Sequence, residues 1–214
     1  MISQPRISVI MPVRLQVYEG QTANPQLKFI RAVESFLNQV YINCELVIIS
    51  DGCSLTNEIV SKKYKQHLKS GIIKLIKRER SELFTGDVRQ QGIDMASGSI
   101  LCNLDADDTI ESYHLNNISK TFDLKFEWVY FNLYRKLDVL NGVEEIVDTQ
   151  MNTNSLCTAS VAWRKDLDVS WNGANGRMDN KIFNQRLIDG FKKVKKIYGM
   201  GYCIRHANLS YAGS

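Results

Sequence analysis

The chain has 214 residues, 44% hydrophobic and 23% charged, and its formal net charge is +4. This composition is that of a globular protein and excludes disordered and collagen-like chains, and the length allows one large domain or two small ones. The five cysteines are odd in number and form no C-x-x-C pair, so reduced thiols are expected. No apolar run is long enough to span a bilayer and no signal peptide opens the chain, so we expect a soluble, cytoplasmic protein.

Apolar runs and amphipathic segments alternate through the first half of the chain. The nearly continuous apolar runs, typical of strands buried on both faces, cover residues 7–13, 45–50, 72–76 and 100–104. The helical segments between them are predicted from 27 to 40, from a cap at Ser54 or Thr56 to Leu68, and over 88–96. This order predicts an α/β fold with a mostly parallel sheet and helices on both faces.

The second half has a more mixed pattern. Strands are predicted over 128–137, 156–164 and 193–198, and a helix over 179–188 that ends at Gly190. No composition break separates the two halves, so independent domains are not indicated.

Three carboxylates follow the fourth predicted strand, where ligands bind in open α/β sheets. Asp105, Asp107 and Asp108 lie within four residues and repel one another. A divalent cation held together with phosphate oxygens explains them, and Mg²⁺ or Mn²⁺ with a nucleotide diphosphate fits. The alternative is a solvated acidic turn that caps a helix starting near Ile110.

Asp51 and Gly52 follow the second predicted strand and are expected at the same sheet edge. One interpretation is a carboxylate that accepts hydrogen bonds from a base or ribose, with Gly52 allowing close approach. The other is a turn with a helix cap.

Seven segments, in order from residue 7 to about residue 210, carry a family resemblance. They are ISVIMPV (7–13), FIRAVESFLNQVY (29–41), ELVIISDGC (45–53), GDVRQQG (86–92), ASGSILCNLDADD (96–108), the pair Met178-Asp179 followed by NKIFNQRL, and YCIRHANLS (202–210). Together they resemble family-2 glycosyltransferases with the GT-A fold. The chain departs from the family pattern at Arg14, Ser50, Cys53, Gln90 and Met178, and about nine extra residues lie around 18–25.

The resemblance implies one GT-A domain over residues 1–214, with a nucleotide-sugar-binding half (1–108) and an acceptor and catalytic half (109–214). It implies a hexosyl- or pentosyltransferase that moves a sugar from a nucleotide-diphosphate sugar, with a UDP-sugar favoured, to an acceptor hydroxyl with inversion. The implied cofactor is Mn²⁺ or Mg²⁺.

The resemblance also implies roles for individual residues. Those implied to bind the nucleotide sugar are Pro12, Arg14, Asp51, Arg89, Asp105, Ala106, Asp107 and Arg205. Asp107 is the implied metal ligand, joined by His206, and Asp179 the general base. From position alone, Asp179 could instead be a helix N-cap, which is compatible with that role. Trp171, in a polar stretch, is a candidate platform for the acceptor.

The sequence leaves the identity of the acceptor open. The chain has two basic clusters, with eight Lys or Arg within 62–80 and four Lys within 192–196. They are interpreted either as solvated faces or as surfaces that attract a polyanion or an anionic membrane. A bacterial surface glycan is favoured over modified bases of phage DNA. A non-catalytic nucleotide-binding module is the other alternative, and a nucleotidyltransferase is disfavoured because PVRLQVYEG is not a phosphate-binding loop.

Overall fold

Strands β1 and β2 are buried on both faces, as their uninterrupted apolar sequences predict. The computed structural model describes residues 4–15, 24–81, 85–122, 126–138, 142–174 and 179–205. In its first half the elements are β1 (Ile7–Val13), α1 (Pro25–Leu37), β2 (Cys44–Asp51), α2 (Ser54–Lys63), α3 (Lys65–Ser70), β3 (Ile73–Arg78), α4 (Thr85–Met95) and β4 (Ile100–Asn103). In the second half they are β5 (Thr109–Ile110), α5 (His114–Thr121), β6 (Trp128–Asp138), β7 (Val143–Asp148), a 3-10 turn (Thr158–Ser160), β8 (Val161–Arg164), α6 (Asp179–Gly190) and β9 (Val194–Ile204).

The described strands form a single nine-stranded sheet in the order β3-β2-β1-β4-β8-β6-β9-β5, with β7 paired to β6. The four strands of the first half are parallel, and β8 pairs antiparallel with β4 and β6. The carboxyl ends of β2 and β4 therefore lie at one edge, with β1 between them. The predicted α/β fold with a mostly parallel sheet is confirmed.

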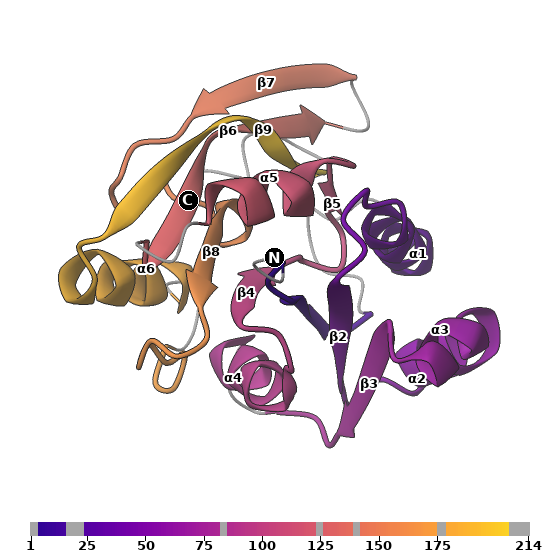
Figure 1. The fold of residues 1–214 in the computed structure, drawn as a ribbon. Coiled ribbons are helices and arrows are strands. Elements are labelled where there is room, and N and C mark those ends of the chain that lie inside the picture. Colours follow the sequence, from indigo (N-terminus) through magenta and orange to yellow (C-terminus); the bar gives the residue numbers. More distant parts are fainter. Residues whose placement is uncertain are drawn as a thin grey trace.

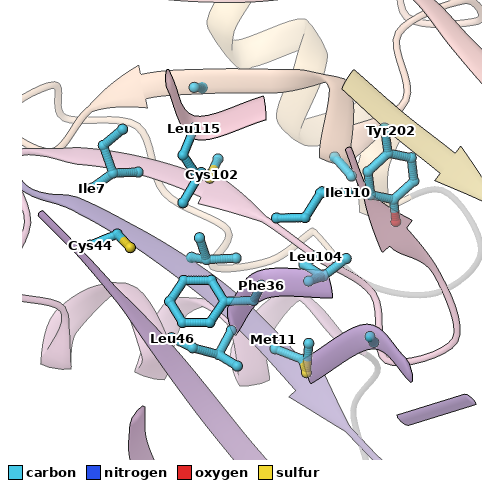
Figure 2. Packing of buried hydrophobic residues seen from close by; sticks show 14 of the residues in the cluster. Ile7, Met11, Phe36, Cys44, Leu46, Cys102, Leu104, Ile110, Leu115 and Tyr202 are labelled. Atoms are coloured by element: carbon cyan, nitrogen blue, oxygen red, sulfur yellow. The ribbon is translucent and has the colours of Figure 1, made fainter. Parts of the chain in front are cut away.

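Helices lie on both faces of this sheet (Figure 1), and an apolar layer packs against each face. Ile7, Val9 and Met11 of β1 point into the layer shared with α1, α2 and α5. Ile10 of the same strand points into the layer shared with α4 and α6. Figure 2 shows part of the first layer, where Phe36 lies among residues of β1, β2 and β4. This alternation follows from the two-residue period of a strand.

Several element boundaries differ from the sequence prediction. The helix expected to start near Ile110 begins at His114, because Thr109 and Ile110 form the short strand β5 against β9. The helix expected to reach Leu68 breaks at Tyr64, and its N-cap is Cys53 without a side-chain cap bond, rather than Ser54 or Thr56.

The strands of the second half also differ from prediction. Strand β9 runs on to Ile204, past the end predicted at residue 198, and β7 has no counterpart among the predicted strands. The segment predicted as a strand over 156–164 is a strand only from Val161.

Candidate active site

The cavity at the end of β2 is lined by two of the residues predicted near the nucleoside, Arg14 and Asp51. Its volume is about 270 Å³. It is lined by Arg14, Leu15, Asp51, Gly52, Cys53, Ser54, Leu55 and Arg80. Gly52 has a φ of +63°, and a Cβ there would lie 2.6 Å from the Arg80 Cβ. The turn after β2 therefore requires glycine, for its backbone angle and for the close approach of Arg80.

The Asp51 carboxylate is 5% exposed and already bonded within the protein. It accepts hydrogen bonds from the guanidinium of Arg14 and, at 2.7 Å, from the backbone N–H of Ser81, and Arg78 Nε lies 3.5 Å away. Asp51 thus ties the segment after β1 to the segment after β3, which gives the cavity its shape.

The three carboxylates after β4 occupy three different environments. Asp105 is one-third exposed and its Oδ1 accepts a hydrogen bond from Arg89 Nη2 at 2.7 Å. The backbone carbonyl of Asp107 accepts from Arg31 Nη2 at 2.7 Å, which fixes the turn that carries its side chain. Asp108 points into the protein and is 4% exposed.

Asp108 holds the end of β9 against the acidic turn, which comprises residues 105–108. Its carboxylate accepts hydrogen bonds from the Tyr202 hydroxyl at 2.6 Å and from the backbone N–H of Arg205 at 2.9 Å. Burial, followed by the charges of Asp107 and Asp105, raises the pKa of Asp108 well above its usual value, and the two hydrogen bonds oppose that rise. The Asp108 carboxylate therefore has a structural role, because it accepts hydrogen bonds from two groups of the same protein.

Asp179 is the first residue of α6 and lies beside the same network. Its side chain is 8% exposed, and its Oδ2 accepts a hydrogen bond from Arg89 Nη1 at 2.9 Å. Its Oδ1 accepts from the backbone N–H of Asn180 at 2.6 Å. Arg89 thus connects two carboxylates that are far apart in the sequence, and it lies here instead of in the cavity beside Asp51.

Trp171 does not fit its predicted role as an acceptor platform. Its side chain is completely buried. One ring, that of Phe183, stacks on it with centroids 4.1 Å apart and planes 8° apart, and the guanidinium carbon of Arg89 lies 4.8 Å from the Trp171 ring centroid. Because protein groups cover this indole, it supports Arg89 and α6 and offers no face to a sugar.

The remaining predicted residues divide between the described part of the chain and the rest. Pro12 is half-buried in β1 beside Ile49 of β2, and Ala106 lies in the acidic turn. Arg205 donates from its Nε to the Thr109 hydroxyl at 3.2 Å. His206, the second predicted metal ligand, lies outside the described residues, as do Met178 and most of the extra segment around 18–25.

Metal ligands are sparse in the part of the chain that the structure describes. Across its described ranges, no group of three or more His, Cys, Asp or Glu side chains is arranged to hold a metal ion. The donor set is consistent with an ion that takes one or two protein carboxylates and completes its shell with water and substrate phosphates, as Mg²⁺ commonly does.

Part of the first basic cluster, within residues 62–80, forms ion pairs with acidic residues of the same protein. Four of its members pair with acids, namely Lys62 with Glu58, Lys63 with Glu34, Lys74 with Glu45 and Arg78 with Asp51. These pairs favour the interpretation of the cluster as solvated and locally neutralised surface over a binding site for a polyanion.

Three contributors to this site were missed from the sequence. Arg31 holds the Asp107 backbone, Tyr202 bonds to Asp108, and Gln90 accepts a hydrogen bond from the Trp171 backbone N–H at 2.9 Å. Tyr202 and Gln90 were inside recognised motifs without an assigned role. Arg31 lies on α1, which was predicted from the spacing of its apolar residues, and that spacing does not indicate a role for a polar residue of the helix.

Three comparisons with known proteins bear on this geometry. The family model described as glycosyl transferase family 2 matches residues 8–154. The minor teichoic acid biosynthesis protein GgaB of Bacillus subtilis (strain 168) is 28% identical over 118 residues, which is 54% of this chain and 12% of that protein. The putative glycosyltransferase EpsH of the same strain is 30% identical over 89 residues, 42% of this chain and 25% of that protein.

Solved structures share the architecture over nearly the whole chain. S. aureus TarS 1-349 in complex with UDP has a TM-score of 0.71 at 15% identity, covering 94% of this chain and 60% of that one. The mannosyltransferase PcManGT from Pyrobaculum calidifontis, in complex with GDP-Man and Mn²⁺, has a TM-score of 0.58 at 11% identity, covering 93% and 57%. This chain thus spans less than two thirds of each of these relatives. Among the described residues, no helix combines the length and apolarity that a membrane crossing needs.

Proposed function

The chain belongs to glycosyl transferase family 2, and from that premise we propose that it transfers a sugar from a nucleotide-diphosphate sugar to an acceptor hydroxyl with inversion. Its fold is the predicted GT-A fold, shared with TarS. The observation that carries the proposal is the convergence of Asp105 and Asp179 on the two amino groups of Arg89. A carboxylate of the acidic turn and a carboxylate suited to proton transfer thereby lie on either side of one guanidinium.

The donor is proposed to lie along the carboxyl edge of β2 and β4. Its nucleoside would occupy the cavity of about 270 Å³ beside Asp51 and Arg14, and its diphosphate the turn of Asp105 and Asp107. A UDP-sugar is favoured, and the complex of TarS with UDP-GlcNAc supports this choice. The mannosyltransferase complex with GDP-Man keeps a guanosine donor as the alternative to be tested.

A divalent cation is proposed to bind together with the donor. Asp107 would hold it, with the diphosphate oxygens and His206 as further ligands, and Mn²⁺ or Mg²⁺ suits such an oxygen-rich shell. When bound, the ion would neutralise the negative charge that develops on the leaving diphosphate. The Mn²⁺ in the mannosyltransferase complex supports this assignment.

Asp179 is proposed as the general base. An acceptor hydroxyl is a weak nucleophile until a carboxylate takes its proton in the transition state. Attack on the anomeric carbon from the side opposite the diphosphate gives inversion. The first residue of a helix is a rigid mount for such a base, and hydrogen bonds from Arg89 and from the Asn180 N–H fix the orientation of the carboxylate.

The acceptor is proposed to be a glycan used in the synthesis of a bacterial surface polymer. The relative named for minor teichoic acid biosynthesis supports this class over DNA. A groove of about 540 Å³ supports an acceptor site in the second half. It is lined by Thr153, Asn154, Lys181, Ile182, Gln185, Arg186 and Asp189. Helix α6 lines this groove and also carries Asp179 at its first residue.

The test is the hydrolysis of UDP-GlcNAc, and of GDP-mannose as the alternative donor, in the presence of Mn²⁺. Asp179→Asn is expected to lower turnover by about 100-fold or more, because it removes the proton acceptor. Nucleotide affinity should be retained, since Asp179 is not part of the cavity beside Asp51. Asp166→Asn is the matched control, because Asp166 also pairs with an arginine, Arg164, but on the exposed surface.

Two outcomes would contradict this function. Turnover in Asp179→Asn equal to that of the wild type would remove the assignment of the base. A thermal-shift screen in which no nucleoside diphosphate raises the unfolding temperature, with or without Mn²⁺, would contradict the whole proposal, because a bound ligand stabilises the native state by mass action.

A further inference from the structure

Arg89 lies inside α4 with only 4% of its side chain exposed, and its two amino groups reach different carboxylates. Nη2 donates to Asp105 at 2.7 Å and Nη1 donates to Asp179 at 2.9 Å. We propose that Arg89 is a positioning residue that sets the place of the base relative to the acidic turn that receives the donor diphosphate. This inference rests on the proposed function, in which Asp179 is the base.

The structure separates this role from contact with the nucleoside, which the family resemblance implies for Arg89. The residues that line the cavity beside Asp51 include Arg14 and Arg80, and Arg89 is not among the described residues that do so. The two hydrogen bonds direct the Arg89 guanidinium toward Asp105 and Asp179, neither of which lines that cavity. A buried guanidinium is tolerated only where it is paired and hydrogen-bonded, which Asp105 and Asp179 provide.

Several contacts around the Trp171 ring fix the position of the Arg89 guanidinium. The Trp171 ring lies 4.8 Å from the guanidinium carbon and is stacked on Phe183 of α6. Gln90, the next residue of α4, accepts hydrogen bonds from the Trp171 backbone N–H at 2.9 Å and from the Ser170 hydroxyl at 3.2 Å. Helix α4 therefore holds both the guanidinium and the ring that supports it, and Phe183 ties that ring to the helix that carries the base.

A lysine at this position cannot reproduce the arrangement. Its ammonium is a compact point charge, whereas the planar guanidinium of Arg89 presents separate donors to Asp105 and Asp179. Lysine would keep the positive charge and lose the fixed spacing between the two carboxylates. A displacement of a reacting group by about 1 Å can lower turnover by about 100-fold, so spacing alone is expected to have a measurable effect.

The experiment compares wild type, Arg89→Lys, Asp179→Asn and the double variant. Turnover is measured as hydrolysis of the active nucleotide sugar with Mn²⁺, and the Kd of the corresponding nucleoside diphosphate is measured by calorimetry. Arg89→Lys is expected to lower kcat by about 100-fold and to change the Kd by no more than about twofold. In the Asp179→Asn background it should lower kcat little further, because residues that act as one unit are not additive.

Arg164→Lys is the matched control, because Arg164 pairs with Asp166 on the exposed surface, and it should leave turnover and Kd unchanged. If Arg89→Lys does not fold, Trp171→Phe is measured in the same way. It keeps an aromatic ring between Arg89 and Phe183, and a smaller fall in kcat with an unchanged Kd is expected.

The failures of the two proposals are distinguishable. A wild-type protein without turnover, or Asp179→Asn with full turnover, contradicts the proposed function and this inference with it. An active wild type in which Arg89→Lys weakens nucleotide binding as strongly as it lowers kcat, or in which the two substitutions multiply, contradicts the positioning role alone.

Discussion

At the scale of single residues, three neighbouring aspartates illustrate how environment separates identical side chains. Asp105 pairs with Arg89, Asp107 lies in a turn held by Arg31, and Asp108 is buried against Tyr202 and Arg205. The sequence predicted a functional acidic group but could not assign these roles, because the partners come from α1, α4 and β9. Asp107 was nevertheless the residue singled out as metal ligand, and that assignment stays a prediction.

Replacing Asp108 by asparagine is expected to destabilise the protein by about 1–3 kcal/mol. The amide has one acceptor oxygen for two donors, so either the part-buried Arg205 N–H faces the amide NH2 and loses its acceptor, or the Tyr202 hydroxyl faces the NH2 and can no longer donate to residue 108. Chemical unfolding at pH 7 measures the loss. Ser70→Ala, which removes only an exposed hydroxyl bonded to the His67 carbonyl, is the control. Equal stability of Asp108→Asn and wild type would contradict this account of Asp108.

At the scale of elements, the sequence identified those with strong apolar periodicity and missed those that depend on pairing. Strand β7 is mostly exposed and carries the charged sequence VEEIVD, so no alternating pattern signals it. Strand β5 has two residues and exists because β9 lies beside it. The predicted end of β9 was too early because Gly199 and Gly201 interrupt its pattern. Gly201 is required where β9 packs closely on His114 and Phe131.

Helix α4 makes a close approach to the segment before α6, and Gly86 is the residue that allows it. A Cβ at Gly86 would lie 2.1 Å from the Ala174 backbone oxygen. Gly86→Ala is therefore expected to push these segments apart and to lower the melting temperature by several degrees, as a loss of about 1–3 kcal/mol would.

The matched control for Gly86→Ala is Gly190→Ala at the end of α6, where an added Cβ meets no atom within 4 Å. Alanine there should leave the melting temperature unchanged or raise it slightly, since it reduces the freedom of the unfolded chain. A Gly86→Ala protein as stable as Gly190→Ala would show that α4 and the 171–174 segment can separate without cost.

At the scale of the whole molecule, Glu45 joins several elements at the sheet edge opposite the candidate site. Its fully buried carboxylate accepts hydrogen bonds from Ser8 of β1 and from Ser97 before β4, and Lys74 of β3 lies 3.0 Å away. Burial acts to raise the pKa of Glu45, but the bonds from Ser8, Ser97 and Lys74 outweigh it and lower the pKa from 4.5 to about 2.

This shift predicts a loss of stability in acid. A depressed pKa in the folded state contributes stability that is complete above pH 4.5 and is lost as the pH falls toward 2. The contribution at pH 7 is on the order of 3 kcal/mol, and more than half of it should be gone at pH 3. Urea unfolding of wild type and Glu45→Gln between pH 3 and 7 measures it. A stability difference between the two proteins that does not shrink toward pH 3 would contradict the assignment.

The amino-acid sequence alone predicts the α/β architecture, the family and the carboxylates of the candidate site. Alternating apolar runs and the residues that follow each strand are local signals, so they can be identified without knowing which residues are in contact. The partners of those residues depend on how the chain packs in three dimensions. This packing brings Arg89 to Asp105 and Asp179, buries Trp171 beneath it and turns Asp108 toward β9. These relations depend on the packing of α4 against α6 and of β9 against the acidic turn, which join segments too distant in the chain for sequence spacing to encode.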